Sequence, residues 1–93
     1  MLPIITEQAA NDILQIADFH TESVALLITS EVIRQVEDLE IFPLLGRSRD
    51  ELKKGLRSFV VRKYIVFYTI WQEIPVVVRV VHGSRDLEAL FAD

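Results

Sequence analysis

The sequence predicts an α+β fold in which a helical hairpin packs on one face of a small, mainly antiparallel sheet. Its first half holds two segments with a helical apolar stripe, joined by only three residues, which makes them antiparallel neighbours. Its second half holds a run over residues 55–86 that is rich in β-branched and aromatic side chains and broken by two turn signals, a pattern typical of a three-stranded meander. We therefore expect one domain over residues 1–93, with the order β-α-α-β-β-β-α.

A short apolar run over residues 2–5 precedes the first helix and contains Pro3. It is predicted to be an edge strand, because proline has no N–H to donate within a central strand. Thr6 is expected to cap a helix from Glu7 to about His20. The apolar stripe predicted for this helix consists of Ala10, Ile13, Leu14 and Ala17.

The second helix is predicted over residues 24–40, with Ser23 as its cap and Pro43 just beyond its end. Its predicted stripe consists of Ala25, Ile28, Val32, Val36 and Leu39, and it is widened by Val24, Leu26, Leu27 and Ile33. This surface is wider than a single contact needs. Two interpretations are open at this stage: a broad core contact, or a face left over for a partner.

The second half is expected to begin with a short helical turn between Ser48 and Gly55, since Ser48 and Glu51 have the spacing of a capping box. The strands of the meander are predicted over residues 56–61, 64–71 and 76–82, with turns at residues 62–63 and 72–75. Gly83 then ends the sheet. A last short helix is expected over residues 87–91, capped by Ser84 or Asp86.

The composition limits the classes of function. The net charge of −4 is uneven: residues 1–46 carry eight acidic side chains against one arginine, whereas residues 47–93 carry nine basic against six acidic ones. The two halves thus carry −7 and +3, which indicates either two solvated faces or a basic half that meets an anionic partner. The acidic half argues against non-specific coating of DNA. No run reaches the ~18 consecutive apolar residues of a membrane span, so no membrane partner is expected.

Cysteine is absent, and the two histidines lie far apart in the sequence. Neither a disulfide framework nor a metal-ligand pattern follows, so we expect no metal and no cofactor. A reducing cytoplasm is compatible with this composition and is the expected location.

The polar residues inside the apolar run are the candidates for chemistry. Strict alternation places Val77, Arg79 and Val81 on one face of the last strand. Arg79 either pairs with a carboxylate such as Glu73 or Asp86 on the open face of the sheet, or binds an anion with its forked donors.

His82 ends this strand and is either a general acid or base or a partner of the turn backbone. Arg57, with Arg62, Lys63 and Arg85, forms a basic rim for which solvation is the default interpretation. The sequence contains no glycine-rich phosphate loop and no nucleophile elbow.

Four segments resemble the RelE/ParE superfamily of toxins, which belong to type II toxin–antitoxin (plasmid stabilisation) modules. They are F-P-L-L-G-R at 42–47, G-L-R-S-F at 55–59, Y-I-V-F-Y at 64–68 and R-V-V-H-G-S-R-D-L at 79–87. The likeness is greatest to the ParE branch, in which a segment similar to R-V-L-H-G-x-R-D is typical. The fold of this superfamily is similar to the order predicted above.

The resemblance implies a toxin that a cognate, ParD-like or other small DNA-binding antitoxin neutralises by wrapping an amphipathic C-terminal segment around it. Contact with DNA would then occur only through the antitoxin. The residues that we expect to bind the antitoxin are Ile28, Val32, Ile33, Val36, Phe67 and Trp71.

Two activities are known in the superfamily: ParE-like members poison DNA gyrase without catalysis, and RelE-like members cut messenger RNA on the ribosome. This chain departs from the ribonuclease pattern, with Ile65 in place of a basic residue and Leu87 and Phe91 in place of a tail tyrosine. We therefore expect a gyrase inhibitor. The candidates for target binding are Arg57, Arg79, His82 and Arg85. The alternatives are an endoribonuclease that uses Arg79, His82 and Arg85, and a degenerate toxin that acts only as an antitoxin partner.

Overall fold

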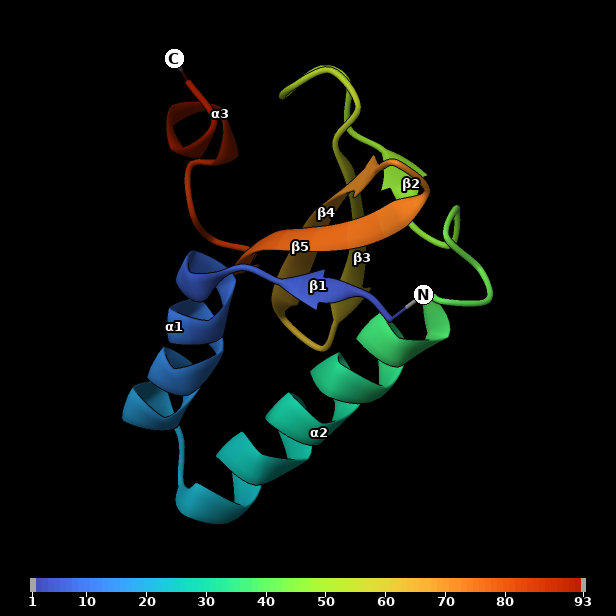
Figure 1. The fold of residues 1–93 in the computed structure, drawn as a ribbon. Helices are drawn as coiled ribbons and strands as arrows, with labels where there is room; N and C mark the ends of the chain where they lie inside the picture. The colour runs from blue at the N-terminus through green and yellow to red at the C-terminus, as the bar shows by residue number, and fades with distance from the viewer. Residues whose placement is uncertain (1, 93) are drawn as a thin grey trace.

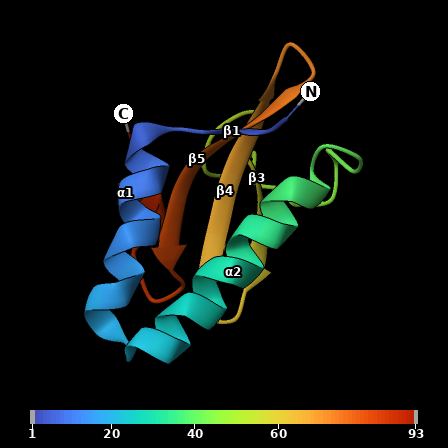
Figure 2. The same ribbon diagram turned by 60° about the horizontal axis from the view of Figure 1, so that its bottom comes forward.

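A sheet in the order β1-β5-β4-β3-β2 forms the centre of the structure, a computed structural model that describes residues 2–92 (Figure 1). Its strands are β1 (Ile4–Ile5), β2 (Arg47–Ser48), β3 (Arg57–Val61), β4 (Tyr64–Trp71) and β5 (Ile74–His82). Its helices are α1 (Glu7–Gln15), the 3-10 helix η1 (Ile16–Phe19), α2 (Glu22–Asp38) and α3 (Leu87–Leu90). Helices α1 and α2 lie on the same side of the sheet, as Figure 2 shows. The predicted fold class and element order are confirmed.

Threonine side chains begin both long helices. Thr6 accepts a hydrogen bond from the N–H of Ala9, as expected, and Thr21 accepts one from the N–H of Val24. The second cap is therefore Thr21 and not Ser23, and α2 begins earlier than predicted. The first helix tightens after Gln15 into η1, so the single helix predicted up to His20 is α1 followed by a 3-10 turn.

The stripe predicted for the first helix is rotated from the one observed. Ala9 and Ile16 are buried, whereas Ala10 and Leu14 are exposed. The buried face of α1 also contains Asp12, which hydrogen-bonds to β5. The prediction placed the buried face elsewhere because an aspartate on a helix normally faces solvent, whereas Asp12 lies within the buried face of α1.

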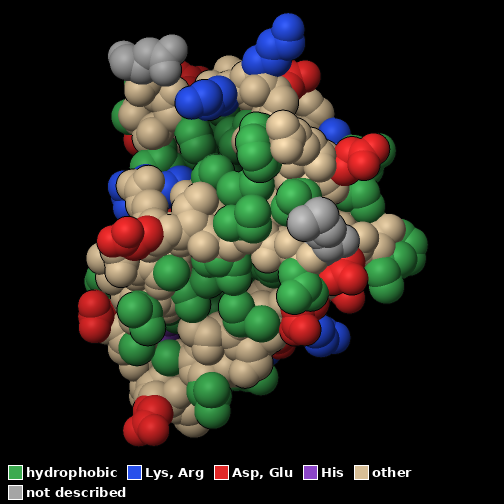
Figure 3. Space-filling view, in the orientation of Figure 1, with side chains coloured by type: hydrophobic (Ala, Val, Ile, Leu, Met, Phe, Trp, Pro, Cys, Tyr) green, Lys and Arg blue, Asp and Glu red, His purple; other side chains and the backbone are tan. Residues whose placement is uncertain are grey.

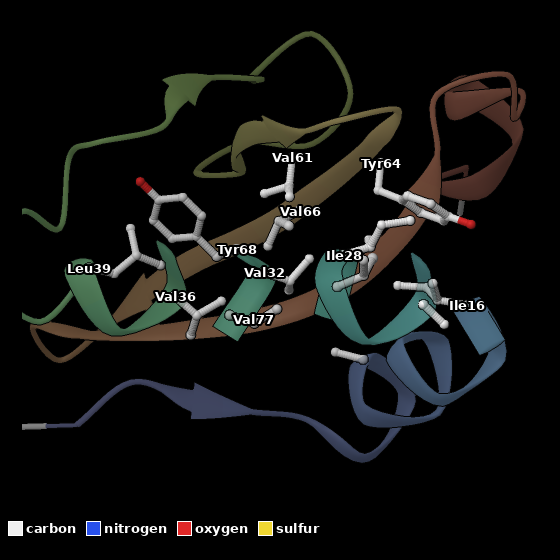
Figure 4. Close-up of a cluster of buried hydrophobic side chains, with 13 residues drawn as sticks. Ile16, Ile28, Val32, Val36, Leu39, Val61, Tyr64, Val66, Tyr68 and Val77 are labelled. Carbon is white, nitrogen blue, oxygen red and sulfur yellow. The ribbon is translucent and has the colours of Figure 1, made fainter. Parts of the chain in front are cut away.

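The main core fills the space between α2 and the sheet (Figure 4). Ile28, Val32 and Val36 are at most 3% exposed there, so the apolar stripe predicted for α2 is buried in the core. Tyr64 and Tyr68 lie at opposite ends of this cluster, with their hydroxyl groups pointing outward in Figure 4. The burial of each aliphatic side chain of α2 in this core contributes about 1.5–3 kcal/mol to the stability of the fold.

A second apolar cluster covers part of the other face of the sheet. Phe67 is completely buried there, and its ring meets the ring of Phe91 edge-on at a centroid distance of 4.7 Å. Leu87 and Leu90 of α3 pack against the same cluster, and Asp86 caps α3 by accepting from the N–H of Ala89. The prediction of one face left open is therefore wrong in part, because the short C-terminal helix folds back over it.

A β-bulge changes the faces of β5. Phe67 pairs with Arg79 but its neighbour Tyr68 pairs with Val77, which leaves Val78 as the extra residue. Val77 and Val80 consequently both pack in the main core, whereas Val78 faces the second cluster. The strict alternation predicted for this strand is wrong from the bulge onward.

Two boundaries in the second half also differ from the prediction. Between Ser48 and Gly55 the structure has β2 followed by turns and no helix: one helical hydrogen bond joins the N–H of Lys53 to the carbonyl oxygen of Arg49 at 3.2 Å, and Asp50 accepts one of 2.8 Å from the N–H of Gly55. The turn between β4 and β5 contains only Gln72 and Glu73, both with positive φ, so Pro75 belongs to β5. Pro75 lies before the residues that pair with β1, where a missing N–H is tolerated.

Candidate functional site

Arg79 is held by a carboxylate from α1. Its Nε and Nη2 atoms donate to the two carboxylate oxygens of Asp12 at 2.7 and 3.1 Å, and the N–H of Val80 donates to the same side chain at 2.9 Å. The two side chains are only 17% and 10% exposed. The predicted partners Glu73 and Asp86 are therefore wrong, because the bulge turns Arg79 toward α1.

Asp12 also completes the edge of the sheet. Strand β1 pairs with β5 only at Val76 and Val77. Further along β5, the Thr6 hydroxyl donates to the carbonyl oxygen of Val78 at 3.5 Å, and the Asp12 carboxylate accepts from the N–H of Val80. Side chains of α1 and its cap thus replace a strand partner for β5.

A cavity of about 450 Å³ opens beside this ion pair, between η1 and the end of β5. Both histidines of the chain line it, together with Tyr64, Ser84 and Arg85. His20 and His82, distant in sequence, are thereby both brought into contact with the Tyr64 ring. Ile16, Val80 and Val81 supply buried apolar walls.

Tyr64 connects the two histidines. Its hydroxyl lies 3.0 Å from Nε2 of His20, and its ring meets the imidazoles of His20 and His82 edge-on at centroid distances of 6.0 and 5.5 Å. Burial raises the pKa of Tyr64 above its usual value, so the phenol stays neutral at neutral pH. It can therefore serve His20 as either donor or acceptor.

His82 is oriented by the turn that follows β5. Its Nδ1 accepts a hydrogen bond from the N–H of Ser84 at 3.1 Å and lies 2.8 Å from the Ser84 hydroxyl. A nitrogen that accepts from a backbone N–H carries no proton, so neutral His82 has its proton on Nε2. The imidazole is thus a fixed donor at the rim of the cavity.

Arg57 lies apart from this cavity. It donates from Nε to the carbonyl oxygen of Gly46 at 2.8 Å and from Nη2 to that of Leu44 at 3.4 Å. Arg62 pairs with Glu31 on the surface of α2 at 3.0 Å. Of the four target-binding candidates, the structure brings His82 and Arg85 together, places Arg79 behind Asp12, and separates Arg57.

The family model described as the ParE toxin of the type II toxin–antitoxin system, parDE, matches residues 4–87. The chain belongs to the ParE toxin family. A curated relative, Toxin ParE3 of Caulobacter vibrioides (strain ATCC 19089 / CIP 103742 / CB 15), is 33% identical over 72 residues, which cover 73% of this chain and 72% of the relative. The predicted superfamily and branch are confirmed.

Several residues that shape the site of this ParE toxin were missed in the sequence. They are Asp12, His20 and Arg49, none of which is among the candidates that the sequence predicts. Arg49 is 8% exposed, donates to Ser58 Oγ at 3.1 Å and to Glu51 at 2.9 Å, and lies 5.6 Å from the centre of the Phe67 ring. The signal for Asp12 was its spacing, three residues after Ala9 and one before Ile13. Arg49 carried no comparable signal.

The antitoxin candidates divide into buried and exposed sets. Four of them are buried in the two cores: Ile28, Val32, Val36 and Phe67. The expectation that these side chains offer an exposed surface to the antitoxin is therefore wrong. Ile33 and Trp71 are 38% and 59% exposed and remain available. No helix within residues 2–92 is long and apolar enough to cross a membrane. Over the same residues no group of acidic or histidine side chains suits a metal ion.

Exposed apolar side chains lie on the helical hairpin and on a second surface at one end of this ParE toxin. Figures 1 and 2 show β1, the β4–β5 turn and the segment after α2 at that end. We call this surface the apolar end; its residues are Leu2, Ile4, Ile41, Phe42, Leu44, Leu45, Ile70 and Trp71. Figure 3 shows hydrophobic side chains over the middle of the face that carries α1, β1 and α2, with acidic side chains mostly around its rim. Exposed apolar side chains grouped in this way are candidates for an interaction surface.

Proposed function

We propose that this toxin inhibits DNA gyrase by binding, without catalysis of its own, and that a ParD-like antitoxin neutralises it. The observation that carries the proposal is the ion pair of Arg79 with Asp12. A ribonuclease needs free cationic donors aimed at the developing charge of the phosphorane. Arg79 instead directs its Nε and Nη2 donors to Asp12, so its charge is already paired within the chain. Leu87 and Phe91 pack in the second cluster in place of a tail tyrosine.

The proposed contact with gyrase uses the exposed basic groups near the end of β5. Arg85 and His82 are exposed, and Arg85 has no side-chain ion pair among residues 2–92. In this proposal Arg57 and Arg79 support the surface indirectly: Arg57 holds the segment before β2, and Arg79 ties β5 to α1. Exposed guanidinium groups are suited to carboxylates on a protein partner.

The proposed antitoxin covers the apolar end. Trp71 and Phe42 are about 60% exposed, and large aromatic side chains of this kind carry much of the binding energy in protein interfaces. An amphipathic antitoxin segment that buries these rings would also reach Ile33 on α2. A complex of this type explains why a small toxin keeps so much apolar surface exposed.

One assay pair tests the target. Purified toxin is added to gyrase with relaxed plasmid, and in parallel to a translation reaction whose messenger RNA is followed by primer extension. We expect supercoiling to be inhibited and the messenger RNA to stay intact. Cleavage of the translated messenger RNA with full gyrase activity would reject the proposal in favour of a RelE-type ribonuclease. Failure to arrest growth on expression without antitoxin would favour a degenerate toxin.

The matched variants are Arg85→Ala and Arg47→Ala. Each removes one exposed arginine, but Arg47 lies in β2 at the opposite edge of the sheet. We expect Arg85→Ala to weaken gyrase inhibition by about tenfold and Arg47→Ala to leave it unchanged. Equal losses would mean that overall positive charge, and no particular surface, determines the inhibition.

A further inference from the structure

We propose that the cavity between η1 and the end of β5 binds a small organic anion, a carboxylate or phosphate monoester carried on an apolar body the size of one ring. This inference goes beyond the gyrase target, because it concerns a free small molecule; it shares Arg85 and His82 with the proposed gyrase contact, and its test needs no gyrase. It rests on three features of the cavity: its charge, its donors and its walls.

The charge of the cavity favours an anion. Arg85 lines it, and its side chain has no ion pair within the described part of the chain. The one carboxylate at the cavity is that of Asp12, which already receives two hydrogen bonds from Arg79 and one from the Val80 N–H. Its negative charge is thus compensated, so Arg85 determines the local potential.

The donors of the cavity are pre-oriented. The contact of His82 Nδ1 with Ser84 leaves the Nε2–H of His82 as a donor of fixed position. The Tyr64 hydroxyl, 3.0 Å from Nε2 of His20, restrains the second imidazole of the cavity. A fixed donor loses little conformational entropy on binding, which is the advantage of a pre-organised site.

The walls of the cavity select a ligand with an apolar part. Ile16, Val80 and Val81 are each at most 4% exposed and form the buried side. Phe19 also lines the cavity but is 76% exposed, so a ring in the cavity would cover part of it. A volume of about 450 Å³ lies in the ordinary range of small-molecule sites and exceeds what an inorganic anion needs.

The test is a titration of ¹⁵N-labelled toxin with phenyl phosphate, followed by two-dimensional NMR, with benzyl alcohol as the uncharged probe of similar shape. We expect saturable binding of phenyl phosphate with a Kd on the order of 1 mM. The shifted amides should cluster in η1 and residues 80–85. Benzyl alcohol should bind at least about tenfold more weakly. Equal affinity for the two probes, or no saturation by phenyl phosphate, would overturn the proposal.

Two arginine variants locate the site. Arg85→Gln removes the proposed anion partner from an exposed turn, and Arg47→Gln removes an exposed charge at the far edge of the sheet. We expect Arg85→Gln to weaken phenyl phosphate binding about tenfold and Arg47→Gln to have no effect. The unliganded NMR spectrum of each variant verifies its fold. Equal weakening by both variants, or shifts centred outside the cavity, would overturn the assignment.

Discussion

Asp12 of α1 binds Arg79 of β5 through both carboxylate oxygens, across a separation of 67 residues. The same carboxylate accepts the N–H of Val80, so it satisfies a side chain and the backbone of one strand together. Removing it would leave a cation and a backbone donor of low exposure without their partner. The pair is therefore a structural connection between the helical hairpin and the sheet.

Asp12→Asn is expected to destabilise the toxin by about 3 kcal/mol. Asparagine keeps an acceptor for Val80 but leaves the Arg79 charge unpaired in a poorly exposed position, which is costly. Urea denaturation at neutral pH measures the change in the free energy of unfolding. The control is Glu31→Gln, which breaks the more exposed pair with Arg62 and should cost less than about 1 kcal/mol. Equal costs would show that the Asp12–Arg79 pair has no special structural weight.

Tyr68→Phe should destabilise the fold by about 2–3 kcal/mol. The Tyr68 hydroxyl accepts from the N–H of Gly46 and donates to the carbonyl oxygen of Pro43, both at 2.8 Å. Phenylalanine leaves these two backbone groups without their partner. Ser30→Ala is the comparison, because the Ser30 hydroxyl is exposed and bonds only to Leu26 of its own helix. Thermal or urea unfolding that ranks the two variants alike would contradict this role of Tyr68.

Tyr64 should make the toxin sensitive to alkali. Burial raises its pKa, so the folded state keeps the phenolic proton at pH values where the unfolded chain begins to lose it. The stabilisation is complete below the unfolded pKa of about 10 and is lost as the pH rises through the folded pKa. We expect the free energy of unfolding to fall more steeply above about pH 10 in the wild type than in Tyr64→Phe. Parallel pH profiles of the two proteins would refute this.

Trp71→Ser is expected to weaken antitoxin binding by about 2 kcal/mol, or roughly thirtyfold in Kd, because Trp71 is the largest exposed ring of the apolar end. Calorimetric titration with the cognate antitoxin gives the affinity. Leu14→Ser is the matched control: Leu14 is 72% exposed but belongs to α1, away from the apolar end. Loss of affinity in the Leu14 variant alone would place the antitoxin on the opposite side of the molecule.

Much of the fold was predictable because local signals and tertiary packing agree. The cap at Thr6, the cap at Asp86 (one of two candidates, with Ser84) and the meander follow from residue chemistry at single positions. The bulge was not predictable, since Val76, Val77 and Val78 are identical and an extra residue among them leaves no mark in the sequence. Only the pairing of Phe67 and Tyr68 with β5 reveals it.

The candidate site was predictable only in part. His82 and Arg85 were singled out from their position at the end of a strand, and both line the cavity. His20 was missed because its partnership with Tyr64 joins residues 44 positions apart, which no local pattern encodes. The ion pair of Arg79 with Asp12 depends on the bulge in β5 and on the packing of α1 against that strand, and neither can be read from the residues next to Arg79.

The placement of Asp12 has a further consequence for how copies of this chain meet one another. A valine-rich strand with bare backbone groups along its side is a template on which other chains aggregate. Thr6 and Asp12 already bind the carbonyl oxygen of Val78 and the N–H of Val80. Another strand therefore cannot form its backbone hydrogen bonds with β5 at that position. The Asp12 carboxylate thus also opposes the addition of strands from other copies of the chain along this side of β5.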